Sequence, residues 1–99
     1  MTFNKLVRDK IPDIIKSEGR ECRYSILSND DYYKELKRKL IEEVNEFIES
    51  DGIEELADLE EVLRAILNVK KISYDDFEKV RNAKVNKRGA FSKKIYLKE

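Results

Sequence analysis

The strongest constraint on the fold is a pair of helix-periodic apolar stripes separated by Asp51-Gly52. Before this break, the apolar residues recur every three or four positions, as Tyr33, Leu36, Leu40, Val44, Phe47 and Ile48. After it, the same spacing continues through Leu56, Leu59, Val62, Leu63, Ile66 and Val69. Such spacing gives each helix one apolar face. The sequence therefore predicts helices over 28–50 and 53–70 that fold back on one another as an antiparallel hairpin.

Shorter elements are predicted on either side of the hairpin. Pro12 and Gly19 bound a short helix at 12–18, and Ser73 caps a third main helix that runs to about residue 85. The segment 87–91 is predicted as a loop, and alternation predicts an extended stretch at 21–27. The tail, 93–99, is predicted as a short strand or an ordered arm. The class is all-α, with the whole chain 1–99 as a single domain that has short extended segments near its termini.

Composition limits the partners of this domain. Its 21 basic and 21 acidic residues cancel, whereas proteins that bind nucleic-acid polymers or anionic membranes carry a basic excess. Three helices with wide apolar stripes offer more apolar surface than 99 residues readily cover. We therefore expect a small helical bundle that is completed by a homodimer or homotetramer.

The rarest residue types exclude several chemistries. The chain has no histidine and one cysteine, Cys22, so an internal disulfide, a Cys/His zinc cluster and a histidine general base are excluded. No apolar run approaches the roughly 20 residues of a membrane span, and the first residues lack the apolar core of a signal peptide. These features favour a cytoplasmic protein.

Four carboxylates lie symmetrically about the predicted turn. Glu43 and Glu46 precede it and Glu55 and Asp58 follow it, each pair at i, i+3 spacing on one helix face. In a hairpin, Glu46 would face Glu55 and Glu43 would face Asp58. Glu55 also continues the series Leu59, Val62 and Ile66 on the core-facing stripe, where an unpaired carboxylate is costly. Converging carboxylates repel one another unless a cation lies among them, and Mg2+ or Mn2+ prefers oxygen ligands.

Basic residues near the two ends of the chain are candidates for phosphate contacts. Arg8, Lys10 and Arg88 lead this set, because a triphosphate needs more positive charge than a metal supplies and arginine can bind phosphate bidentately. Lys39 fits two interpretations equally well. It is either an intrahelical partner of Glu42 and Glu43 or a further phosphate contact.

Several segments together resemble a known family. Residues 39–46 read KLIEEVNE and residues 55–58 read ELAD, which is similar to the KxxEExxE and ExxD signature of the all-alpha nucleoside triphosphate pyrophosphohydrolases. These include MazG-like proteins and phosphoribosyl-ATP pyrophosphohydrolase. The opening NKLVRDKIP at 4–12 and RGAF at 88–91 resemble a compact MazG-like subgroup, so the resemblance covers nearly the whole chain.

The resemblance implies a Mg2+-dependent enzyme that cleaves a nucleotide between its α and β phosphates and releases pyrophosphate. It makes Glu43, Glu46, Glu55 and Asp58 metal ligands, and it makes Glu42 a second ligand or a water-orienting base. Glu46 is the other candidate base. The chain lacks the histidine that often follows ExxD in phosphoribosyl-ATP pyrophosphohydrolase, which argues against the substrate of that enzyme.

Two alternatives remain open. A non-catalytic helical interaction module would show the same amphipathic hairpin, although it gives no reason for carboxylates on the core-facing stripe. A regulatory protein that senses a metal or a nucleotide without turnover would share the site, and an activity assay separates it from an enzyme.

Overall fold

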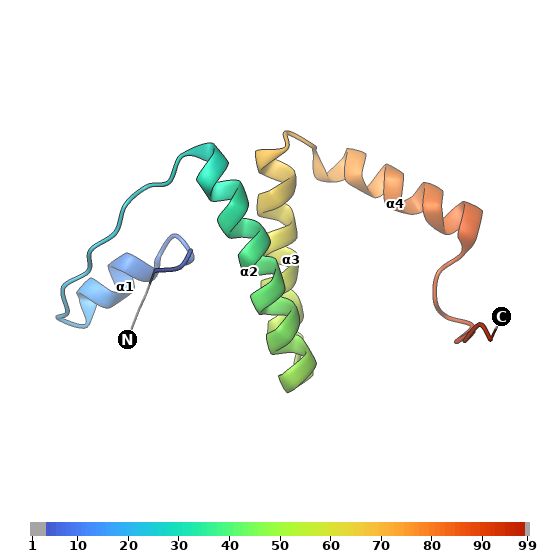
Figure 1. Cartoon of the computed structure of the whole chain (residues 1–99), viewed down its shortest axis with the longest axis horizontal. Coiled ribbons are helices and arrows are strands. Elements are labelled where there is room, and N and C mark those ends of the chain that lie inside the picture. The colour runs from blue at the N-terminus through green and yellow to red at the C-terminus, as the bar shows by residue number, and fades with distance from the viewer. Residues whose placement is uncertain (1–3, 99) are drawn as a thin grey trace.

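A computed structural model describes residues 4–98 of the chain. Within these residues the chain forms four helices and no strand. They are α1 (Ile11–Ser17), α2 (Asn29–Ser50), α3 (Ile53–Val69) and α4 (Tyr74–Arg88). Figure 1 shows α2 and α3 side by side and antiparallel at the centre of the molecule. The predicted all-α class and the helical hairpin are confirmed.

Local capping sets the ends of the hairpin helices. The Ser28 hydroxyl accepts a hydrogen bond of 3.2 Å from the Asp31 backbone N–H and starts α2. Asp51 ends α2 in the left-handed region at φ 58°, and Gly52 begins α3 in an extended conformation. A Cβ at Gly52 would lie 2.8 Å from Oε2 of Glu55, so a side chain at this position would displace the flexible Glu55 carboxylate. Packing buries Leu36 (2% exposed) and Val62 between the helices.

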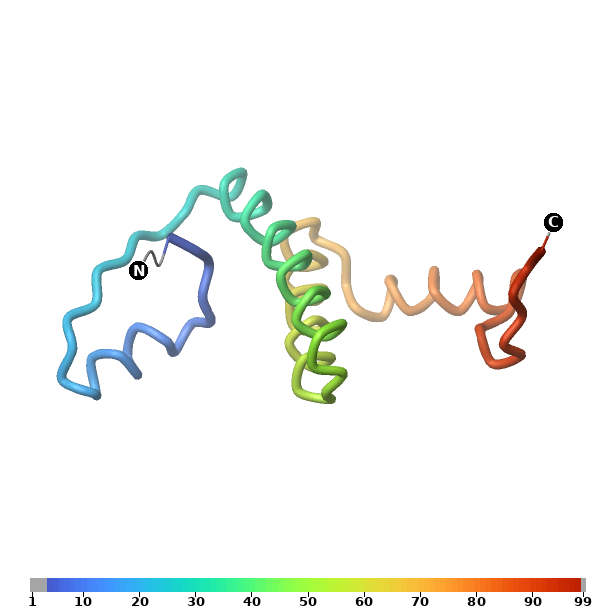
Figure 2. Tube along the Cα trace, turned by 60° about the horizontal axis from the view of Figure 1, so that its bottom comes forward, coloured from blue at the N-terminus to red at the C-terminus, as the bar shows by residue number. Residues whose placement is uncertain are grey.

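The outer helices leave the hairpin on opposite sides (Figures 1 and 2). Within residues 4–98, α1 packs against no other helix, and α4 contacts only the end of α3. The Tyr74 hydroxyl donates a 3.0 Å hydrogen bond to Glu60, and the Arg64 guanidinium lies 4.2 Å from the centre of the Tyr74 ring. These contacts between α3 and α4 fix where α4 begins, while the rest of α4 lies apart from the hairpin.

The predicted end of the third main helix, about residue 85, was too early. Helix α4 continues to Arg88, so Lys87 and Arg88 are helical and do not belong to a loop. Cations in the last turn favour the negative end of the helix dipole, and Gly89 then ends the helix at φ 86°. Of the two alternatives for the tail, the strand does not form across residues 93–98.

This arrangement is open. The Cα radius of gyration is 17.5 Å, compared with about 13 Å for a compact domain of this length. The accessible surface is 9334 Å², whereas a compact monomer of 11.7 kDa exposes about 5,900 Å². None of the described helices is long and apolar enough to span a membrane.

Candidate acidic groove

A groove of about 390 Å³ runs along one side of the hairpin and is closed by the N-terminal segment. Residues 6–10 form one wall, and side chains of α2 and α3 form the others. They are Tyr32, Leu36, Lys39 and Glu43 from α2, and Asp58, Glu61, Val62 and Ala65 from α3. The volume falls within the range of small-molecule sites. The hairpin therefore brings Glu43 and Asp58 to one groove, as the spacing predicted.

Glu43 is the most unusual side chain in the groove. It is only 5% exposed, and its Oε2 is buried without a hydrogen-bond partner among the described residues. Burial raises the pKa of the Glu43 carboxyl, and the nearby charges of Glu46 and Asp58 raise that pKa further, against the opposing charge of Lys39. An unpartnered buried carboxylate oxygen is costly unless something binds it.

Three cations lie next to these carboxylates. Lys39 Nζ is 3.5 Å from Glu42 Oε1 and 3.6 Å from Glu43 Oε1, which matches one of the two roles predicted for it, that of intrahelical partner. Lys5 Nζ is 3.8 Å from Glu42 Oε1. Arg8 donates a 2.6 Å hydrogen bond to Oδ1 of Asp58 across 50 positions of the chain. The N-terminal segment thus supplies positive charge directly to the acidic side of the hairpin.

The four predicted ligands do not form one cluster. The charges of Glu46 and Asp58 both raise the pKa of the Glu43 carboxyl, so these three groups lie near one another. The carboxylate of Glu55 instead lies against Gly52 at the hairpin turn. Across residues 4–98, no three acidic or cysteine side chains are close enough together to hold a metal ion as they stand. Glu55 occupies the first turn of α3, where a carboxylate is stabilised by the free N–H groups and the helix dipole.

The predicted phosphate contacts separate into two groups. Arg8, Lys10 and Lys39 line the groove. Arg88 ends α4, which runs away from the hairpin (Figure 1), so it does not reach the groove of its own chain.

Two polar side chains that the hairpin contributes to the groove, Tyr32 and Glu61, were not among the predicted site residues. Tyr32 precedes Leu36, Lys39 and Glu43 at intervals of four, three and four, a signal that would have placed it on the groove side of α2. Glu61 follows Asp58 by three positions, and it is both solvent-exposed and part of the groove wall. An aromatic ring beside a cationic segment adds a surface on which a base can stack.

The residues present fit a hard divalent cation by their chemistry. Glu43, Glu46 and Asp58 offer only oxygen donors, which Mg2+ and Mn2+ prefer, and the buried Oε2 of Glu43 lacks a partner in the described structure. The cations now beside Glu43 and Asp58 are side chains, Lys39 and Arg8. These three carboxylates are therefore the residues that would hold a metal, with Glu55 next along the hairpin.

The raised pKa of Glu43 predicts a pH-dependent stability in metal-free protein. The folded state holds the Glu43 proton to a higher pH than the unfolded state, whose pKa is near 4.5. Stability therefore falls as pH rises through the interval between the two pKa values, and the penalty persists above it. In EDTA at neutral pH, Glu43→Gln should raise the free energy of unfolding by about 1 kcal/mol, or roughly 4–8 °C in Tm. Below pH 4.5 the gain should vanish.

The matched control for this experiment is Glu49→Gln, an exposed glutamate on the same helix. It should leave Tm nearly unchanged at both pH values. Equal melting temperatures for Glu43→Gln and the wild type at neutral pH would contradict the inference that the buried Glu43 carboxylate destabilises the metal-free protein.

Comparison with known proteins gives one partial similarity. The chain is 45% identical over 47 residues to an uncharacterized protein of Mycolicibacterium smegmatis (strain ATCC 700084 / mc(2)155), and the match spans 48% of this chain and 48% of that protein. The chain thus covers about half the length of the curated relative. No protein-family model and no solved structure matches the chain.

Proposed function

We propose that this protein is a Mg2+-dependent nucleotide pyrophosphohydrolase that cleaves a nucleoside triphosphate or related nucleotide into a monophosphate and pyrophosphate. The observation that carries the proposal is Glu43, a buried carboxylate with an oxygen that has no hydrogen-bond partner among residues 4–98 and that shares a groove with Asp58 on the facing helix. A purely structural hairpin gains nothing from such a group, because an apolar side chain would stabilise the same position. The resemblance of KLIEEVNE and ELAD to the all-alpha pyrophosphohydrolases supports the same function.

The groove offers the charges that a triphosphate requires. Glu43, Glu46, Asp58 and, nearer the turn, Glu55 would hold the metal, which supplies charge neutralisation of the phosphates and a water of lowered pKa. Arg8 and Lys10 on the N-terminal wall provide donors for phosphate oxygens. Glu42 or Glu46 would accept the proton of the attacking water. Lys39 neutralises Glu42 and Glu43 and holds their carboxylates in place.

Nucleotide turnover is the direct test. Purified protein with Mg2+ should release pyrophosphate from at least one member of a panel of standard and modified nucleotides. Release of single phosphate groups alone would contradict cleavage between the α and β phosphates. Binding of a nucleotide without turnover would identify a sensing protein instead of an enzyme.

Metal binding should also stabilise the fold. An ion that binds only the folded state adds about 2.7 kcal/mol at a hundredfold excess over its Kd. Mg2+ or Mn2+ should therefore raise Tm, EDTA should reverse the rise, and Asp58→Asn should abolish it. A melting curve that responds neither to metal nor to chelator would favour the non-catalytic interaction module, a function for which the open shape offers ample apolar surface.

Oligomerisation belongs to the same proposal. The surface of the chain exceeds that of a compact monomer by about 3,500 Å², more than the roughly 1,600 Å² that a standard protein interface buries. Ile41, Val44 and Leu56 lie exposed along the hairpin and provide helix faces for a homodimer or homotetramer. In such an assembly, Arg88 would serve the groove of a neighbouring subunit.

A further inference from the structure

The charges of this neutral chain are separated along its length. Residues 29–69, which form the hairpin, hold 13 acidic and 5 basic side chains, whereas residues 82–98 hold six basic and no acidic ones. No ion pair joins any of these six cations to a carboxylate within the described residues. Among the residues that the structure describes, the C-terminal part of the chain therefore carries positive charge that no ion pair neutralises.

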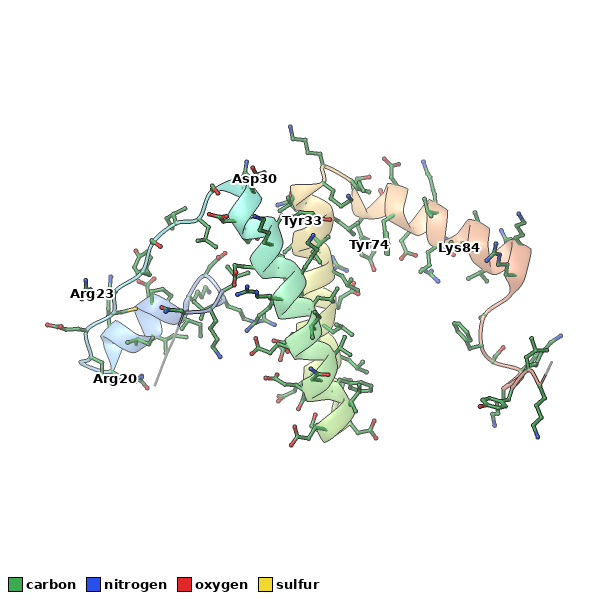
Figure 3. The ribbon with its side chains drawn as sticks, in the orientation of Figure 1. Arg20, Arg23, Asp30, Tyr33, Tyr74 and Lys84 are labelled. Atoms are coloured by element: carbon green, nitrogen blue, oxygen red, sulfur yellow. The ribbon has the colours of Figure 1, made fainter. Side chains whose placement is uncertain are left out.

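The same region is strongly apolar. Residues 89–98, here called the C-terminal arm, carry Phe91 (98% exposed) together with Ile95, Tyr96 and Leu97, each about four-fifths exposed. Figure 3 shows the side chains of the arm extending into solvent with no other element around them. Four large exposed apolar side chains in ten residues form a contact surface that needs a partner.

A complementary surface lies at the turn of the hairpin. The tip patch, as we name it, combines two strongly exposed isoleucines, Ile48 and Ile53, with three exposed carboxylates, those of Glu49, Asp51 and Glu54. None of these three carboxylates takes part in an ion pair within residues 4–98. The arm carries three lysines, Lys93, Lys94 and Lys98, so the two surfaces match in both charge and apolar character.

The arm does not reach the tip patch of its own chain in this fold. Helix α4 starts at the end of α3 that is remote from the turn, and it leads away from the hairpin (Figures 1 and 2). We propose that the C-terminal arm of one copy docks on the tip patch of a second copy, and that the exchange is reciprocal in a closed, two-fold dimer. Opposite charges would steer the encounter, and the aromatic and aliphatic side chains would bury the apolar surface. This inference is independent of catalysis.

Charge exchange tests the contact. Two double variants reverse the charges, Lys93→Glu/Lys94→Glu on the arm and Glu49→Lys/Glu54→Lys on the tip patch. In sedimentation velocity, each variant alone should show a dimer dissociation constant raised by about tenfold or more. An equimolar mixture of the two variants should associate. Lys34→Glu/Lys71→Glu makes the same change in net charge as the lysine exchange, away from both surfaces, and should leave association unchanged. A monomeric wild type, or a dimer that neither exchange weakens, would overturn the proposal.

Cross-linking between two different copies locates the contact. In a Cys22→Ala background, one chain would carry Leu97→Cys and the other Ile53→Cys. Oxidation of the mixture should give a disulfide-linked pair, while Ile14→Cys, exposed on α1, should not pair with Leu97→Cys. A chain carrying both substitutions that cross-links only within itself, or equal yields with the α1 control, would contradict docking on a second copy.

Discussion

Glu43→Gln and Asp58→Asn should each lower the rate of pyrophosphate release by at least about a hundredfold, equivalent to about 2.7 kcal/mol of transition-state stabilisation. Both substitutions preserve the size of the side chain while removing the negative charge that would hold a divalent cation. Glu46→Gln should have a similar effect, because Glu46 lies close enough to affect the pKa of Glu43. Initial rates at saturating Mg2+ and nucleotide measure this loss.

Stability data distinguish loss of the site from loss of the fold. Glu43→Gln should be inactive and yet melt above the wild type in EDTA, because the buried charge is gone. Glu55→Gln provides a comparison with the Glu43 variant, because the Glu55 carboxylate of the wild type lies over the hairpin turn and apart from Glu43. Wild-type turnover in the Glu43, Glu46, Glu55 and Asp58 variants would refute the proposed metal site.

Arg8→Ala should weaken nucleotide binding by about tenfold, or ~1.4 kcal/mol, while it strengthens Mg2+ binding slightly. Arg8 now holds Asp58, so its removal deletes a phosphate donor and frees a metal ligand. The gain in Mg2+ affinity should not exceed about fivefold, because an ion pair between two partly exposed side chains contributes roughly 1 kcal/mol or less. Calorimetric titration with Mg2+ alone and with a non-hydrolysable nucleotide measures the two effects separately.

Arg20→Ala is the matched control for Arg8. Arg20 follows α1 and pairs with Glu18, far from the hairpin in Figure 3, so its removal should change neither titration. If Arg8→Ala and Arg20→Ala behave alike, Arg8 makes no phosphate contact. A separate loss in Arg88→Ala would show that the end of α4 reaches the groove of a neighbouring subunit.

The sequence predicted the elements whose causes are local. The cap at Ser73 was confirmed, and Ser28 caps α2 in the same way, because each cap depends on a hydroxyl and a backbone N–H three residues later. The break at Asp51-Gly52 follows from Asp51, which adopts the left-handed conformation that ends α2. The i, i+3 spacing also placed Glu43 and Asp58 on facing sides of the hairpin, since helix periodicity and a short turn fix that register.

Tertiary structure decided what local rules leave open. Several partners far apart in the chain compete for the same side chains. This competition decides which cation pairs with Asp58, and whether Glu55 joins Glu43 or lies over Gly52. The Glu43 oxygen that lacks a partner in the described structure also depends on tertiary packing, because Glu43 lies in a groove that α2, α3 and residues 6–10 line together. The sequence by itself thus determined the helices and their acidic faces. Packing determined the groove, the pairing of its charges and the large exposed surface, because these depend on contacts that helix periodicity does not encode.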